Sequence, residues 1–137
     1  MSLPPLRDIL EEDELVEAED RYRLLIDLGE QLEPMPNALK TDATRVRGCS
    51  ASVWVYPTAD EGRLTFLADS NAAITKGIVA LVLAAVQGKP AAEIADMDIA
   101  AALAPFELGK HLSANRTQGV PNMIALITGT AARYAAN

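Results

Sequence analysis

The stretch from Ile74 to Val86 is apolar on nearly every side of a helix, and it constrains the fold more than any other part of the sequence. One helical face holds Ile74, Ile78, Leu81, Val82 and Ala85. A second face, nearly as apolar, holds Val79, Leu83 and Val86. The longest apolar run, residues 78–86, is far shorter than the roughly 20 residues that cross a bilayer. The sequence therefore predicts a central, buried helix that runs to about Gln87, with Gly88 as its C-terminal stop.

Two helices are predicted before this segment. A short helix over residues 4–12 can begin at Pro4 or Pro5, where a missing N–H costs little. The next helix runs from about Asp13 to Leu32, because apolar residues recur there at helical spacing while acids fill the other face. Its apolar face consists of Leu15, Ala18, Tyr22, Leu25, Ile26, Leu28 and Leu32. The prolines that follow prevent its continuation.

The middle of the chain is typical of β structure. Residues 45–47, 52–56 and 63–68 are rich in β-forming residues and are separated by turn residues, which predicts three short strands. The segment PTADEG, residues 57–62, joins the second and third strands as an antiparallel hairpin. We therefore expect an α+β fold in which helices pack on one face of a small three-stranded antiparallel sheet, with residues 1–137 in a single domain.

The rest of the chain, after the central helix, is predicted to be helical. Three polar residues are candidate N-caps of the central helix: Asp69, Ser70 and Asn71. Short helices are expected from Lys89 to Asp96 and from Asp98 to Ala104. Pro121 would remove a hydrogen bond from a helix that had already run two turns, so the last helix should kink or restart near Val120 and continue to about residue 135.

The charge of the chain is unevenly distributed. Its net charge is −7, and residues 1–33 carry eleven of the nineteen acidic residues but only three of the twelve basic ones. The acidic segment is either a solvated helix face or an acidic docking surface. The chain lacks the basic surface that binds phosphates, so no nucleic-acid partner is expected. No basic segment precedes an apolar stretch at the N-terminus, so we expect no membrane partner and a cytoplasmic location.

Cys49 is the only cysteine and His111 the only histidine, which excludes an internal disulfide and the usual multi-cysteine zinc site. A lone cysteine is commonly a small buried hydrophobe. Three local features favour chemistry instead. Cys49 lies between two predicted strands, where a loop tip is expected, and Gly48 lets another molecule approach. Arg45 and Arg47, which share one face of a strand, should lower the pKa of the thiol.

Three blocks of the sequence resemble motifs of the SufE family. VRGCSASVW, residues 46–54, resembles the family signature of Gly-Cys, two or three small or polar residues, and Val-Trp. ADSNAAITKG, residues 68–77, and HLSANRTQG, residues 111–119, are similar to two further blocks. The blocks occur in order and with consistent spacing, so the resemblance extends over roughly residues 8–135.

The resemblance implies a sulfur carrier. Family members accept a sulfur atom from the persulfide on a pyridoxal-phosphate-dependent cysteine desulfurase of the SufS or CsdA type, hold it as a cysteine persulfide and deliver it to an iron–sulfur assembly scaffold. Cys49 matches the acceptor, which implies that this chain activates the desulfurase as a co-substrate and is not an independent enzyme. The pyridoxal phosphate belongs to the partner, so no cofactor or metal is expected here. The implied SufE/IscU-like fold keeps the cysteine against apolar groups, for which Val53 and Trp54 are candidates.

Four further positions are candidates for the partner interface or for support of the cysteine loop: Gly48, Arg116, His111 and Asp69. The resemblance implies that Arg116 lies near the cysteine loop or in the interface, and the alternative is a solvated arginine. His111 either moves a proton near the thiol or lines a turn. Asp69 either faces the desulfurase or serves as an N-cap. Lys76, the only charge on the central helix, should reach the surface or meet a carboxylate.

Two other functions stay open at the level of sequence. Cys49 and His111 could form the reactive pair of a thiol hydrolase or transferase. Alternatively, the chain could be a non-catalytic interaction adaptor of the same fold, with an inert Cys49. The sequence does not indicate the oligomeric state, the particular desulfurase or the downstream acceptor.

Overall fold

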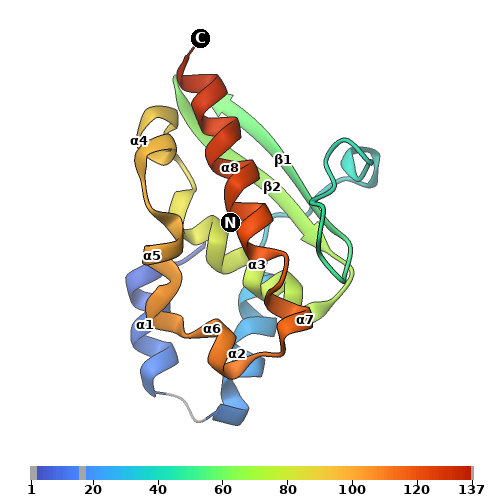
Figure 1. Cartoon of the computed structure of the whole chain (residues 1–137), viewed down its shortest axis with the longest axis vertical. Helices are drawn as coiled ribbons and strands as arrows, with labels where there is room; N and C mark the ends of the chain where they lie inside the picture. The colour runs from blue at the N-terminus through green and yellow to red at the C-terminus, as the bar shows by residue number, and fades with distance from the viewer. Residues whose placement is uncertain (1–2, 16–17, 137) are drawn as a thin grey trace.

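The computed structural model describes residues 3–15 and 18–136, and it combines one antiparallel sheet with helices (Figure 1). The helices are α1 (Leu6–Leu15), α2 (Ala18–Glu30), α3 (Ala73–Val86), α4 (Ala91–Asp96), α5 (Ile99–Leu103), α6 (Leu108–His111), α7 (Ala114–Thr117) and α8 (Val120–Ala135). The 3-10 turns are η1 (Asn37–Leu39) and η2 (Ala104–Phe106). The strands, in spatial order, are β1 (Val53–Asp60), β2 (Arg63–Ser70) and β3 (Lys89–Pro90). The predicted α+β class with a three-stranded antiparallel sheet is confirmed.

Helix α3 is the centre of the core, as the sequence predicts. Every residue from 78 to 83 is at most 1% exposed, and the helix contacts α2 on one side and β2 on another. A Cβ on Gly77 would collide with the carbonyl of Leu25, so the two helices cross at a distance that only glycine permits. After the helix, Gly88 has a φ of +74°, which confirms it as the predicted stop.

The β1–β2 hairpin is longer and its turn tighter than predicted. Only Glu61 and Gly62 connect the strands, with φ values of +53° and +80° that match the two-residue turn preferred by twisted hairpins. The predicted six-residue loop over 57–62 is therefore wrong. Pro57 is accommodated inside β1 because its backbone nitrogen, like that of Val55, faces away from β2 and is not needed for the ladder.

The third strand is not the predicted one. Residues 45–47 form no strand; Arg45 makes a single bridge to Trp54, because the chain turns away immediately afterwards. The third strand is β3, where a helix was predicted to start, and it pairs Lys89 with Leu64 of β2. The bridge at Arg45 nevertheless anchors the segment that leads to Cys49 beside β1.

The first two helices are divided differently from the prediction. Helix α1 extends to Leu15, whose side chain is 87% exposed and is not part of the apolar face predicted for the second helix. Leu25 and Leu28 of that face are buried as predicted, whereas Tyr22 is 38% exposed. The side chain of Ala18, another predicted member, lies outside the described side chains.

Helices α4 to α8 complete the fold. The carboxylate of Asp98 accepts a hydrogen bond from the N–H of Ala101 and caps α5. Helix α8 begins at Val120 with Pro121 in its first turn, which confirms the predicted restart, and it packs on α4. In the described ranges, no helix combines the length and the apolar character that a membrane crossing requires.

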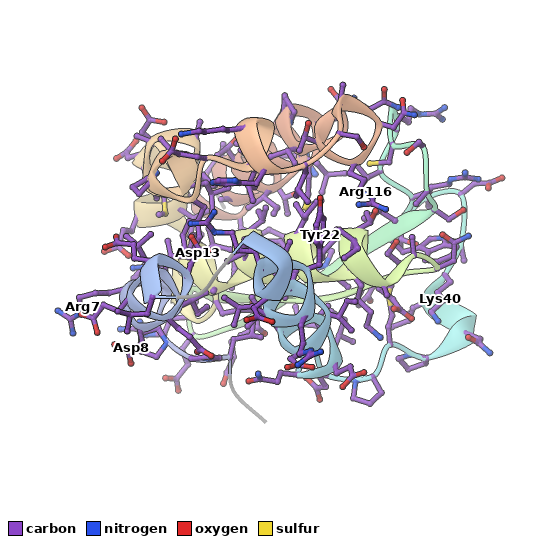
Figure 2. The ribbon with its side chains drawn as sticks, turned by 90° about the horizontal axis from the view of Figure 1, so that it is seen from below. Arg7, Asp8, Asp13, Tyr22, Lys40 and Arg116 are labelled. Atoms are coloured by element: carbon purple, nitrogen blue, oxygen red, sulfur yellow. The ribbon has the colours of Figure 1, made fainter. Side chains whose placement is uncertain are left out.

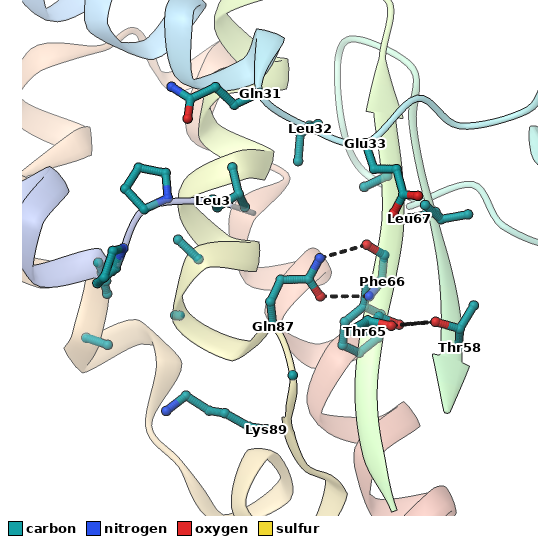
Figure 3. A pocket seen from close by; sticks show the side chains of 18 of the residues that line it. Leu3, Gln31, Leu32, Glu33, Thr58, Thr65, Phe66, Leu67, Gln87 and Lys89 are labelled. Carbon is teal, nitrogen blue, oxygen red and sulfur yellow. Dashed lines mark hydrogen bonds between the residues drawn. The ribbon is translucent and has the colours of Figure 1, made fainter. Parts of the chain in front are cut away.

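A wide groove of the described surface follows the edge of β2. Just before β3 begins, the side-chain amide of Gln87 takes the place of a strand: it accepts a hydrogen bond from the N–H of Phe66 at 2.7 Å and donates one to the carbonyl of Phe66 at 3.0 Å (Figure 3). The groove beside this pair has a volume of about 1050 Å³ and is also lined by residues 3–6 and by residues 31–33, which follow α2. Cys49 is not among its lining residues.

Candidate functional site at Cys49

The loop that carries Cys49 is fixed to the start of α8. It turns at Gly48, where φ is +84°, a conformation that favours glycine. A Cβ on Gly48 would also collide with Nδ2 of Asn122, and this same nitrogen donates a 2.8 Å hydrogen bond to the carbonyl of Arg47. Glycine is therefore required here both for its conformation and for the close approach of α8.

The sulfur of Cys49 packs against Gly119, the residue that precedes α8. A Cβ on Gly119 would collide with Sγ and would lie 3.1 Å from both Cα and Cβ of Cys49. Gly119 is buried and Cys49 is half-buried. The missing side chain of Gly119 thus provides the space that the sulfur occupies.

A narrow cleft of about 10 Å³ lies beside the thiol, roughly the space of one water molecule. Its apolar wall is formed by Ile78 of α3 with Val120 and Met123 of α8. The predicted wall of Val53 and Trp54 is wrong, because β1 begins there and its alternation turns Val53 into the sheet core and Trp54 to the opposite face. The other residues that line the cleft with Cys49 are Ser50, Ala51, Thr75, Asn115, Arg116 and Gly119.

Hydrogen bonds also hold the second half of the loop. The hydroxyl of Ser50 donates to the carbonyl of Asn115 in α7 at 2.7 Å. The N–H of Ser52 donates to Oδ1 of Asn71 at 3.1 Å, and the N–H of Asn71 donates to the carbonyl of Ser52 at 3.3 Å. The loop is therefore attached to α7, to α8 and to the segment that enters α3.

Burial raises the pKa of the Cys49 thiol, and the nearby charge of Arg45 offsets this effect only in part. The prediction that Arg45 and Arg47 lower the pKa is thus wrong in its net direction. Both arginines are exposed while Val46 between them is buried, as the predicted alternation requires, so water screens their charge. Burial in the cleft therefore favours the protonated, weakly nucleophilic form of the thiol.

Arg116 lies beside Cys49. It lines the same cleft from α7, and its guanidinium Cζ lies 5.7 Å from the centre of the Tyr22 ring, toward which it points in Figure 2. Such a cation–π contact restrains an otherwise exposed side chain. The structure therefore brings Arg116 together with Cys49, although 67 positions separate them in the sequence.

His111, in contrast, does not line the cleft. The imidazole of His111 lies against Arg21: Nη1 of Arg21 is 3.2 Å from Nδ1 and 3.1 Å from Nε2 of the ring. The hydroxyl of Tyr22 donates a 3.1 Å hydrogen bond to the backbone carbonyl of His111. Asp13 completes this cluster, with its Oδ1 at 3.4 Å from Nε of Arg21. Burial raises the pKa of the Asp13 carboxyl, although the charges of Arg21 and His111 act in the opposite direction. The structure does not pair His111 with the thiol.

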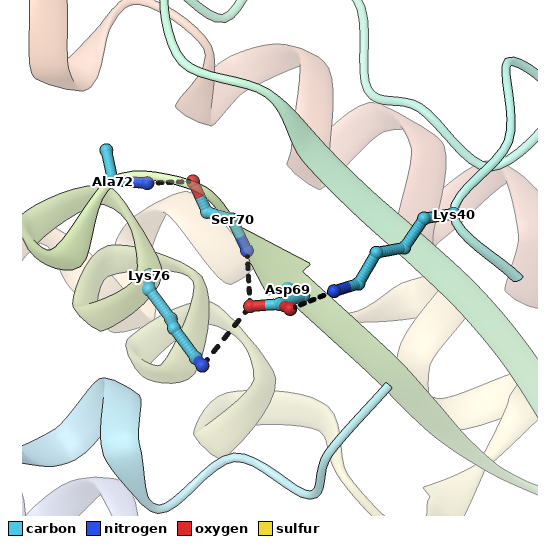
Figure 4. A network of polar contacts seen from close by, with 5 residues as sticks. All are labelled: Lys40, Asp69, Ser70, Ala72 and Lys76. Atoms are coloured by element: carbon cyan, nitrogen blue, oxygen red, sulfur yellow. Dashed lines mark hydrogen bonds and ion pairs between the residues drawn. The ribbon is translucent and has the colours of Figure 1, made fainter. Parts of the chain in front are cut away.

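Asp69 lies in β2 and is the centre of a polar cluster (Figure 4). Its carboxylate contacts Nζ of Lys40 at 2.6 Å and Nζ of Lys76 at 3.2 Å, and it accepts a 2.8 Å hydrogen bond from the N–H of Ser70. Burial alone would raise its pKa, but these three donors outweigh burial and hold the pKa below its usual value. The predicted N-cap role is wrong, because α3 begins only after Ala72, whereas the expected carboxylate partner of Lys76 is confirmed.

Three residues that shape the cleft were missed by sequence reasoning: Thr75, Gly119 and Asn122. Thr75 lies in the block of residues 68–77 and Gly119 in the block of residues 111–119, and this position within motifs that resemble the family could have identified both as candidates. Asn122 carries no such signal, because its contact with Arg47 spans 75 positions of sequence.

Comparisons with known proteins agree with this fold and show the family of the chain. The family model SufE, described as an Fe-S metabolism associated domain, matches residues 7–131. An uncharacterized SufE-like protein of Rhizobium meliloti is 40% identical over 121 residues, which cover 85% of this chain and 86% of that protein. The sulfur acceptor protein CsdE of Escherichia coli is 41% identical over 107 residues, which cover 77% of this chain and 73% of that protein. The solution structure of a hypothetical protein from Thermus thermophilus is similar in fold, with a TM-score of 0.78, 16% identity and full coverage of both chains.

Proposed function

Because this chain belongs to the SufE family, we propose that Cys49 accepts a sulfur atom from the persulfide of a pyridoxal-phosphate-dependent cysteine desulfurase. The observation that carries the proposal is the position of the thiol, half-buried in a cleft with about 10 Å³ of space beside it for one added atom. The similarity to a protein named as a sulfur acceptor supports it. Residues 1–137 act as one sulfur-acceptor domain, and the pyridoxal phosphate stays in the partner.

The transfer is a thiol–disulfide type of exchange. The Cys49 thiolate attacks the outer sulfur of the donor persulfide, forming a new S–S bond. The donor S–S bond breaks and the donor cysteine leaves as a thiolate, so one thiolate is consumed and one is released. The sulfur moves without an external oxidant or reductant.

The proposal extends to both sides of this step. Removal of the persulfide frees the active site of the desulfurase, so the chain stimulates its turnover. The persulfide on Cys49 then passes its terminal sulfur to an iron–sulfur cluster assembly scaffold, which regenerates the thiol. The chain is a carrier and an activator, with the carbon–sulfur cleavage performed by the desulfurase.

Docking of the desulfurase should move the cysteine loop outward. In the cleft, burial raises the pKa of the thiol and so disfavours the reactive thiolate. The hydrogen bonds from Asn122 to Arg47 and from Ser50 to Asn115 hold the loop, and each is worth only about 1 kcal/mol. A partner surface can therefore displace the loop. Alkylation of Cys49 should be slow in the free protein and faster in the complex; equal rates would count against this movement.

The candidate residues divide into two groups in this proposal. Gly48 and Arg116 belong to the interface, because Gly48 precedes the thiol and Arg116 lines the cleft. Asp69 and His111 act as support: Asp69 joins β2 to α3 through Lys76, and His111 joins α6 to α2. Arg116→Ala should therefore reduce sulfur transfer from the desulfurase more than His111→Ala does.

The decisive experiment is the intact mass of the protein after incubation with a cysteine desulfurase, pyridoxal phosphate and cysteine. The wild type should gain the mass of one sulfur atom, which a thiol reductant removes, and Cys49→Ala should gain none. Ester or amide hydrolysis that is lost in both Cys49→Ala and His111→Ala would indicate a thiol hydrolase instead. An unchanged mass in a stable complex with the desulfurase would indicate an interaction adaptor.

A further inference from the structure

The first turn of α3 lies beside the Cys49 cleft and has unused hydrogen-bond donors. Ala72, the residue before the helix, provides no side-chain cap. Within residues 3–15 and 18–136, the N–H groups of Ala73, Ile74 and Thr75 have no hydrogen-bond acceptor. Such a helix N-terminus carries a partial positive charge and attracts anions.

Thr75 adds an independent observation. Its exposed fraction is only 8%, and it lines both the Cys49 cleft and the groove that adjoins it. Across the described part of the chain, no group hydrogen bonds with its hydroxyl, whereas the buried hydroxyl of Thr130 accepts a 3.2 Å hydrogen bond from Arg133. The hydroxyl oxygen is not among the enclosed atoms that lack a partner, so it stays open to the spaces that Thr75 lines, and it is a donor that a ligand in the cleft would satisfy.

The charges around these donors favour an anion. The cleft and the adjoining groove share five lining residues: Ser50, Ala51, Thr75, Asn115 and Arg116. Arg116 lines both spaces while its guanidinium lies against Tyr22, and Arg45 exerts a favourable charge on ionised Cys49. Of the described residues that line these two spaces, none carries a carboxylate.

We propose that Thr75 and the first turn of α3 bind the anionic terminal sulfur of a persulfide on Cys49. The inference rests on the proposed function and locates a binding site for its product in this chain. A hydropersulfide is a stronger acid than a thiol, so its terminal sulfur is negatively charged at neutral pH. This atom lies about 2.05 Å beyond Sγ and requires space for one atom, which the cleft of about 10 Å³ provides.

The site discriminates between the two states of Cys49. The neutral thiol gains little from nearby N–H and O–H donors, whereas an anion gains a charge-assisted hydrogen bond from each. The donors therefore stabilise the sulfur-loaded protein relative to the empty one. They also keep the terminal sulfur in its anionic form, which repels nucleophiles and so protects the sulfur from being removed by small molecules.

The test uses a persulfide that is made without the desulfurase. Inorganic polysulfide loads the protein of residues 1–137: the Cys49 thiolate bonds to a polysulfide sulfur, an S–S bond of the polysulfide breaks, and the shortened polysulfide leaves. The near-ultraviolet absorbance of the persulfide anion is then followed against pH in the wild type, Thr75→Val and Thr75→Ser. Thr75→Val removes the hydroxyl while preserving the shape of the side chain, and Thr75→Ser restores the hydroxyl.

Thr75→Val should lower the acid ionisation constant of the persulfide about tenfold, equivalent to one pKa unit or about 1.4 kcal/mol. Thr75→Ser should stay within about twofold of the wild type, because it keeps the charge-assisted hydrogen bond. Cyanide provides a second measurement: its carbon bonds to the terminal sulfur, the S–S bond breaks, Cys49 leaves as a thiolate, and thiocyanate forms. Since the protonated persulfide is the better electrophile, thiocyanate should form several times faster from Thr75→Val at neutral pH.

Thr128→Val is the matched control. The Thr128 hydroxyl donates to the carbonyl of Ile124 in α8 and does not line the cleft, so the ionisation of the persulfide should not change. Thr75→Ala replaces Thr75→Val if the latter does not fold. Equal ionisation constants in the wild type and the Thr75 variants would overturn the inference while leaving sulfur acceptance intact. A wild-type protein that keeps no polysulfide-derived sulfur would overturn it too, whereas failure of transfer from the desulfurase alone would overturn only the proposed function.

Discussion

The side chain of Asn122 holds the backbone of Arg47, two residues before the thiol, through a 2.8 Å hydrogen bond from Nδ2 to the carbonyl oxygen. The two residues are 75 positions apart in the sequence. Because Gly119 of the same region packs on the sulfur of Cys49, the start of α8 determines both the path of the loop and the space around the thiol. The reactivity of Cys49 is therefore controlled by a helix that is remote in sequence.

Asn122→Ala should make Cys49 alkylate faster. Loss of a hydrogen bond worth about 1 kcal/mol lets the loop leave the cleft about five times as often, and the thiol ionises more readily outside it. The rate with iodoacetamide, measured in the free protein at neutral pH, checks this outcome. Asn37→Ala, at an exposed position in η1, is the control and should react like the wild type. An unchanged rate in Asn122→Ala would show that this hydrogen bond does not restrain the loop.

Gly119→Ala should destabilise the protein by about 1–3 kcal/mol, because the new methyl group collides with the sulfur of Cys49. Urea unfolding measures this cost. Gly109→Ala is the control: open space surrounds Gly109, so alanine should be neutral or slightly stabilising there. In a Cys49→Ala background the sulfur is absent and Gly119→Ala should cost less. Additive effects of the two substitutions would contradict the contact.

The alkylation rate of Cys49 should rise with pH along a curve whose midpoint lies above that of an exposed cysteine, because burial raises the pKa of the thiol. Arg45→Gln should shift the midpoint further upward, since the charge of Arg45 opposes that effect. The same shift makes stability depend on pH. The stability contributed by the protonated thiol is complete below the unfolded-state pKa of about 8.5 and is lost as the pH rises through the folded-state pKa. Cys49→Ala should lack this alkaline loss of stability.

Asp69→Asn should destabilise the protein by about 1 kcal/mol at pH 7, because it weakens contacts with Lys40 and Lys76 that water partly screens. The pKa of Asp69 is held below its usual value, so its contribution to stability is present above the unfolded-state pKa of about 3.9 and is lost as the pH falls through the folded-state pKa. Urea unfolding should therefore show that the free energies of unfolding of the variant and the wild type differ less near pH 2 than at pH 7. A difference independent of pH would exclude the ion pairs as its source.

Local patterns predicted the parts of the fold that depend on nearby residues. The apolar periodicity of residues 74–86 predicted the buried α3, and Pro121 predicted the start of α8 near Val120, because each effect acts within a few turns of helix. Spacing of motifs identified Cys49 as the residue of interest. The β1–β2 hairpin was predicted with a longer loop, since nothing in PTADEG alone shows that Glu61 adopts a positive φ.

The sequence by itself determined the buried helix α3, the start of α8 near Val120, the existence of the β1–β2 hairpin, and where the only thiol lies. Tertiary structure alone decided that Lys89 and Pro90 form the third strand, that Asp69 meets two lysines instead of capping α3, and that burial outweighs Arg45 in setting the pKa of the thiol. The reason is physical: propensity and periodicity act between neighbours along the chain, whereas strand pairing, ion pairing and desolvation depend on groups that only folding brings together.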